Sequence, residues 1–107
     1  MAKKGLASVP QGGFHLPELP EKLGIDPILA GLLHMACFME LSGEDAVDFD
    51  ESVSALEVMS SYLQRLTRAR CNEIEEQLRR VASYAKRHGW EARAAKFIRN
   101  LLQNAGK

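Results

Sequence analysis

The sequence predicts an all-α protein: an antiparallel bundle of three to four helices with an extended N-terminal arm. After residue 26, apolar residues recur at spacings of three and four, and no segment shows the period-two alternation of a β-strand. The chain has 107 residues, of which 46% are hydrophobic and 26% charged, with 14 basic and 14 acidic side chains. These values fit one globular domain and exclude a strongly basic or acidic class. No apolar run approaches the roughly 18 residues that span a bilayer, so we expect no membrane partner.

We divide the chain into an arm, residues 1–25, and a helical bundle domain, residues 26–107. The arm holds three of the four prolines and shows neither a helical nor a strand period. We expect it to be extended and ordered only where four apolar side chains find a surface; simple disorder is the alternative. These side chains are Phe14, Leu16, Leu19 and Leu23.

The first helix is predicted over residues 27–41. Asp26 is a good N-cap, Pro27 suits the first helical position, and Ser42-Gly43 ends the segment. Between residues 28 and 41 only His34 and Glu40 are polar. A helix that is apolar nearly all round is buried on most sides, so this helix is either the centre of the fold or part of a subunit interface.

The next two helices are predicted over residues 50–69 and 72–88. Asp48 with Glu51 has capping-box spacing, and Asp50 is a second candidate cap. The five-residue step between Leu66 and Cys71 interrupts the three-four repeat. A break near Arg70, with Asn72 capping a new helix, explains this step; one continuous helix of nearly 40 residues is the alternative. The usual length of helices favours the break.

The last helix is predicted over residues 90–104. Gly89 is a natural left-handed residue to end the preceding helix after His88. The core is predicted to collect the apolar stripes of the four helices: Ile28, Leu32, Leu33, Met39, Leu56, Met59, Leu63, Leu66, Ile74, Leu78, Val81, Trp90, Phe97, Ile98 and Leu101.

The charges are distributed unevenly along the chain. Residues 1–51 carry three basic and nine acidic side chains, whereas residues 52–107 carry eleven basic and five acidic ones. Helical geometry places the basic residues of the last two helices opposite their apolar stripes. Such faces either lie in solvent, pair with the acidic segment 44–51 of the same or another chain, or bind phosphate. The candidates for nucleic-acid contact are Arg79, Arg80, Arg87, Arg93, Lys96 and Arg99.

The sequence offers little for catalysis or metal binding. His34 and Cys37 share a helix face, but zinc needs about four ligands and the other candidates are scattered. No phosphate-binding glycine loop or nucleophile motif is present. We therefore predict no catalytic residues, no metal and no cofactor. Two cysteines without a secretory signal indicate reduced thiols and a cytoplasmic protein, although a disulfide between Cys37 and Cys71 stays open.

The sequence therefore favours a non-catalytic protein-interaction or oligomerisation module. The apolar helix 27–41 needs more covering than the other helices supply, which predicts a homodimer or a helical protein partner. We place the contact at Leu33, His34 and Phe38. The alternative is a nucleic-acid-binding protein that uses the basic C-terminal helical hairpin.

Overall fold

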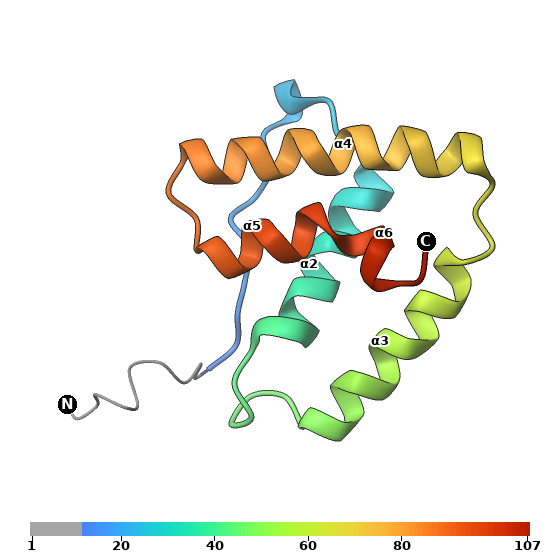
Figure 1. Ribbon diagram of the computed structural model, residues 1–107. Coiled ribbons are helices and arrows are strands. Elements are labelled where there is room, and N and C mark those ends of the chain that lie inside the picture. Colours follow the sequence, from blue (N-terminus) through green and yellow to red (C-terminus); the bar gives the residue numbers. More distant parts are fainter. Residues whose placement is uncertain (1–11) are drawn as a thin grey trace.

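The computed structural model describes residues 12–107 and is all-helical over that range (Figure 1). A short 3₁₀ turn, η1 (Glu21–Leu23), precedes five α-helices. These are α2 (Pro27–Leu41), α3 (Phe49–Leu63), α4 (Arg68–Arg87), α5 (Ala92–Arg99) and α6 (Leu101–Asn104). Over residues 12–107 no strand is present, which confirms the predicted all-α class.

The helices pack around an antiparallel hairpin. α4 and α5 lie alongside each other in opposite directions, and α6 continues the path of the chain beyond α5 (Figure 1). α2 packs against α5 and α3, and α3 also contacts α6. The C-terminus returns to the α3–α4 connection, where Lys107 Nζ donates to Leu66 O at 3.0 Å.

The first two helices begin where their capping residues predict. Asp26 Oδ1 accepts a hydrogen bond from Ile28 N at 2.8 Å, and Pro27 occupies the first turn of α2. Asp48 Oδ2 accepts from Glu51 N at 3.0 Å, which makes Asp48 rather than Asp50 the N-cap of α3. In both cases one carboxylate satisfies a backbone N–H that has no partner within the helix.

The predicted break between the second and third helices is confirmed, but its predicted position is wrong. α3 ends at Leu63 and α4 begins at Arg68, so the cap is Thr67 and not Asn72. Thr67 Oγ1 accepts from Arg70 N at 3.1 Å. The short turn between the helices carries Leu66, whose N donates to Leu63 O at 3.1 Å, and this turn accounts for the irregular step to Cys71.

The predicted end of α4 is confirmed, but the prediction of one continuous last helix is wrong. Gly89 has φ +73°, and the N–H of the next residue, Trp90, donates to Ala85 O at 2.9 Å, as in a Schellman motif. The segment predicted as one helix over residues 90–104 divides at Asn100, where φ is −102°. Asparagine is a weak helix former. The bend leaves Leu101 and Leu102 both 1% exposed.

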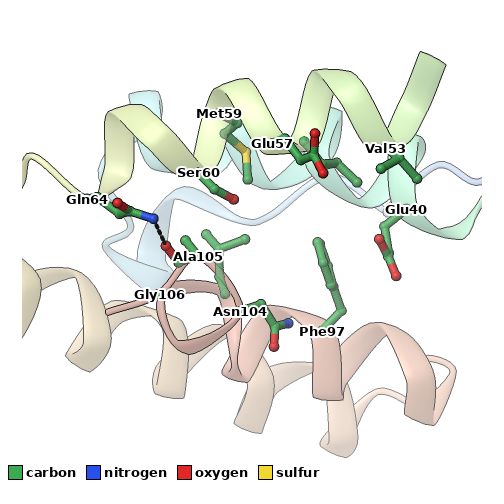
Figure 2. Close-up of a pocket in the computed structure, with 12 residues that line it drawn as sticks. Glu40, Val53, Glu57, Met59, Ser60, Gln64, Phe97, Asn104, Ala105 and Gly106 are labelled. Carbon is green, nitrogen blue, oxygen red and sulfur yellow. Dashed lines mark hydrogen bonds between the residues drawn. The ribbon is translucent and has the colours of Figure 1, made fainter. Parts of the chain in front are cut away.

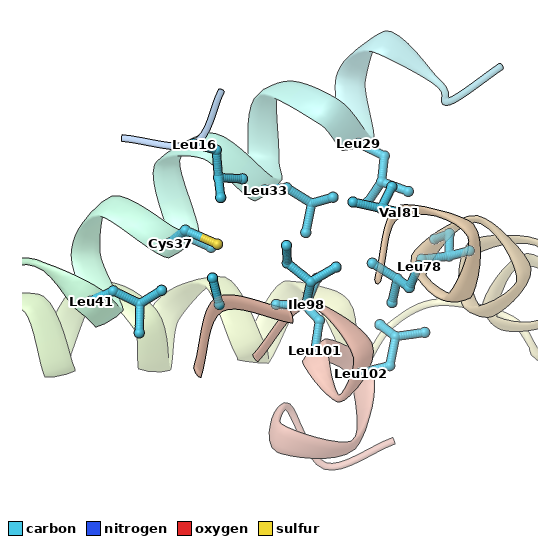
Figure 3. Packing of buried hydrophobic residues seen from close by; sticks show 13 residues of the cluster. Leu16, Leu29, Leu33, Cys37, Leu41, Leu78, Val81, Ile98, Leu101 and Leu102 are labelled. Carbon is cyan, nitrogen blue, oxygen red and sulfur yellow. The ribbon is translucent and has the colours of Figure 1, made fainter. Parts of the chain in front are cut away.

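The core lies where α2 meets the α4–α5 hairpin. Leu33, Leu78, Val81 and Ile98 are completely buried and their side chains converge (Figure 3). One predicted core residue is wrong: Ile28 is 84% exposed because it lies on the outer side of α2. Several other predicted core residues are only partly buried, namely Leu32, Met39, Leu56, Met59, Leu63, Leu66, Trp90 and Phe97.

The described part of the predicted arm packs on the bundle. Leu16 is only 5% exposed, and Phe14 N donates to Ser42 Oγ at 2.8 Å. At the other end, Arg80 Nη1 donates to Leu23 O at 2.6 Å and to Gly24 O at 3.1 Å. Residues 12–25 are thus fixed to α2 and α4, whereas residues 1–11 of the predicted arm lie outside the described residues.

Within residues 12–107, no helix combines the length and hydropathy needed to cross a membrane.

Substitutions of one buried and one exposed residue of α2 test this packing. Leu33→Ala is expected to lower the free energy of unfolding by about 2–5 kcal/mol, because it leaves a cavity at a completely buried site. Ile28→Ala, on the exposed side of the same helix, is expected to change it by less than about 0.5 kcal/mol. Urea unfolding followed by circular dichroism measures both, and equal losses would contradict the described orientation of α2.

Candidate functional site

The three residues predicted to contact a partner do not form an exposed surface. Leu33 is completely buried, which confirms its predicted place in the core and leaves it no exposed surface for a partner. Phe38 is partly buried and is covered by the chain's own arm, since the rings of His15 and Phe38 lie 5.3 Å apart. His34 is also partly buried. Of the three predicted contact residues, Leu33 lies in the core and Phe38 lies against the arm, so neither offers a free surface.

A different face of α2 remains exposed. Ile28 is 84% exposed and Met35, two turns further along, is 62% exposed. Gly31 lies between them, and a Cβ built at this glycine would meet no heavy atom within 4 Å. The only charged residue of α2 is Glu40, near its C-terminal end. This α2 stripe is therefore apolar and uncharged, and it allows close approach of another backbone.

The helix α3 is the least buried of the long helices. Ser52 is its only buried residue among 15. Four of its larger apolar side chains are exposed, namely Phe49, Val53, Val58 and Tyr62. The inner stripe of Leu56, Met59 and Leu63 is only partly buried, although it packs against the core. One side of α3 therefore lacks a partner within residues 12–107.

Beside α3 runs an open groove, with α5 and α6 as its other wall (Figure 2). It encloses about 650 Å³, and its apolar lining includes Val53, Leu56, Met59, Phe97 and Leu101. Phe97 points from α5 into the space between the helices (Figure 2). At one end Gln64 Nε2 donates to Ala105 O at 2.9 Å.

Two exposed carboxylates, those of Glu40 and Glu57, line this groove, and no basic residue of the described range 12–107 does. We call it the acidic-edged groove. An apolar floor with a few charged groups at the edge is the usual arrangement for binding an amphipathic segment.

A second groove lies between α4 and α5 and encloses about 410 Å³. Arg79 and Lys86 line it from α4, and Lys96 and Arg99 line it from α5. Its floor includes alanines, and no carboxylate from the described part of the chain contributes to the lining. We call it the basic groove.

The basic groove gathers only some of the predicted nucleic-acid contacts. Arg79, Lys96 and Arg99 line it, whereas Arg87 is exposed but does not. Arg80 and Arg93 make internal contacts instead. Arg80 bonds the arm and Glu76, while Arg93 Nη1 donates to Leu41 O at 3.1 Å. Two of the six predicted contacts, Arg80 and Arg93, therefore hold the fold together, and nucleic-acid binding by the basic hairpin stays a prediction.

The acidic and basic halves of the sequence do not neutralise each other in the described part of the chain. The three ion pairs found there are all local: Arg70–Glu73, Arg80–Glu76 and Arg93–Glu91. Hydrogen bonding to Arg80 lowers the pKa of Glu76, as expected for such a pair. The cations of the basic groove form no ion pair among residues 12–107, although the charge of Arg79 contributes to the lowered pKa of Glu76.

In the described part of the chain, the potential metal ligands and the thiols form neither a metal centre nor a disulfide. Over residues 12–107 no group of three or more His, Cys, Asp and Glu side chains is arranged to hold a metal ion. Both cysteines are free thiols, so the alternative of a disulfide between them is not realised. Burial, with a smaller contribution from Glu40, raises the pKa of Cys37 from 9.0 to about 12.

No protein-family model, curated protein or solved structure matches this chain. The two grooves are therefore interpreted from their own geometry and charge.

The raised pKa of Cys37 predicts a loss of stability in alkali. Above about pH 9 the unfolded chain releases the thiol proton that the folded chain retains, so the free energy of unfolding falls as pH rises. Urea unfolding at about pH 8 and pH 10.5 is expected to show a smaller decrease for Cys37→Ala than for the unsubstituted chain. Cys71→Ala is the matched control and should keep the full decrease. An unchanged decrease in Cys37→Ala would contradict this account.

Proposed function

We propose that this chain is a non-catalytic protein-interaction module that binds an amphipathic helix in the acidic-edged groove. The observation that carries the proposal is the apolar groove of about 650 Å³ beside α3, a helix with a single buried residue. A surface of this kind is costly to leave in water and is typical of a binding site.

The apolar side chains that line the groove belong to the edge of the hydrophobic core. Leu56, Met59 and Phe97 pack against the buried cluster and also face the groove. An inserted apolar side chain would remove these surfaces from water, and complete burial of one large apolar side chain stabilises a complex by about 1.5–3 kcal/mol. A helix laid along the groove would present such side chains at spacings of three and four residues.

The charge at the groove's edge defines the partner further. Glu40 and Glu57 are exposed there, and none of the lining residues that the structure describes is basic. Lysine or arginine residues flanking the apolar stripe of a partner helix would meet these carboxylates. Complementary charge of this kind mainly sets orientation and the rate of association.

Self-association through the α2 stripe is a second candidate, favoured by the exposure of Ile28 and Met35. Two copies of an uncharged stripe can pack around a two-fold axis without electrostatic repulsion. Gly31, between these residues, would let the two helices approach closely. A homodimer of this kind leaves the acidic-edged groove available for a different partner.

We also propose a cytoplasmic location. Cys37 and Cys71 are free thiols, the state that reducing compartments maintain.

A pair of valines on α3 tests the groove. The probe is an 18-residue leucine/lysine peptide designed as an amphipathic helix, and binding is measured by fluorescence anisotropy. Val53→Lys places a positive charge in the groove lining and is expected to weaken binding by about tenfold or more. Val58→Lys changes the same residue type on the same helix outside the lining and should leave affinity unchanged. Absence of binding, or equal effects of both substitutions, would refute the groove as the site.

Sedimentation velocity tests self-association. The unsubstituted chain is expected to show a concentration-dependent dimer, and Met35→Asp is expected to shift it to monomer by placing a charge in the apolar stripe. Val58→Asp, at a similarly exposed position on α3, should not alter the dimer. A monomer at all concentrations of the unsubstituted chain would exclude this candidate while leaving the groove proposal intact.

A further inference from the structure

We infer that the basic groove between α4 and α5 is a second binding site, and that it accepts an acidic amphipathic helix. It differs in place and charge from the acidic-edged groove, so the inference does not depend on the proposed function. Within residues 12–107 three features carry it: two rows of cations that form no ion pair, a floor of small residues, and a lining without a carboxylate.

The cations are arranged along both walls of the groove. Arg79 and Lys86 stand seven residues apart on α4, which corresponds to about 10 Å along a helix axis. Lys96 and Arg99 stand on the opposite wall, on α5. None of the four forms an ion pair within residues 12–107. A helix with carboxylates along both edges of one face could meet the two rows together.

The floor of the groove decides between an acidic helix and a nucleic-acid backbone. Ala82 and Ala95 are 6% and 5% exposed, and Ala92 and Trp90 continue the apolar lining toward the α4–α5 turn. Small floor residues allow a partner's apolar side chains to enter between the cationic walls. A sugar-phosphate backbone carries a charge at every repeat and has no stripe of large apolar side chains to place there. Amphipathic helices combine both features, which is why they suit such grooves.

The test uses the full chain labelled with ¹⁵N and four probes. The first is an 18-residue leucine/glutamate peptide designed as an amphipathic helix. The controls are a scrambled peptide of identical composition, the leucine/lysine peptide of the preceding section, and a 20-nucleotide single-stranded DNA. The leucine/glutamate peptide is expected to shift amide resonances around Arg79, Ser83, Lys96 and Arg99, and the leucine/lysine peptide those around α3 and α6.

Three variants define the contribution of charge and shape. Arg79→Glu combined with Lys96→Glu is expected to weaken binding of the leucine/glutamate peptide by about tenfold or more. Arg68→Glu combined with Arg87→Glu makes the same change of net charge at exposed positions outside the lining, and should have a much smaller effect. Ser83→Trp keeps all charges but fills the exposed part of the groove. It should weaken binding of the leucine/glutamate peptide, whereas a ligand held by charge alone should bind as before.

Several results would overturn the inference. Absence of resonance shifts at millimolar peptide and low salt would exclude the site. Equal binding of the scrambled peptide would show that the groove does not recognise an amphipathic helix. Tighter binding of the DNA to the same residues, unaffected by Ser83→Trp, would assign the groove to nucleic acid instead. Loss of leucine/lysine binding alone would contradict the proposed function and leave this inference unaffected.

Discussion

The structure depends on covering α2. This helix has no charged residue before Glu40, so water is an unfavourable neighbour on nearly every side. The α4–α5 hairpin covers one side through Leu78, Val81 and Ile98, and the arm covers another. Side-chain hydrogen bonds from Arg80 and Arg93 to backbone carbonyls tie the hairpin to the arm and to the end of α2. One side of α3 remains open, as does the α2 stripe at Ile28 and Met35.

The local structure was largely predictable because capping and turn residues act over a few positions. Asp26, Asp48 and Gly89 end or begin helices through hydrogen bonds and backbone angles that the sequence alone specifies. The boundary between α3 and α4 was misplaced because Thr67 and Asn72 are both acceptable caps, and packing decides between them. No glycine or proline lies near Asn100, so the sequence pattern did not predict that the last helix divides there.

The candidate site was less predictable because exposure depends on which helices meet. Periodicity identifies α2 as an apolar helix and places Leu33 in the core, but it cannot tell which faces the arm and the hairpin cover, so Ile28 was assigned to the wrong environment. Likewise, Arg80 and Arg99 look equivalent in sequence, yet only the first lies near the carbonyls of the arm. The acidic-edged groove joins residues more than 40 positions apart, such as Val53 and Phe97, and no local pattern reveals it.

The central claim is that α3 lacks a covering partner in the described chain, and native-state hydrogen exchange tests it directly. With few buried contacts, α3 should open locally, and its amides should exchange faster than those of α4, whose inner face is completely buried at Leu78 and Val81. A protein partner that fills the groove should slow this exchange selectively. Protection of α3 equal to that of α4 in the free chain would contradict the account, because it would mean that the helix is already fully stabilised without a partner.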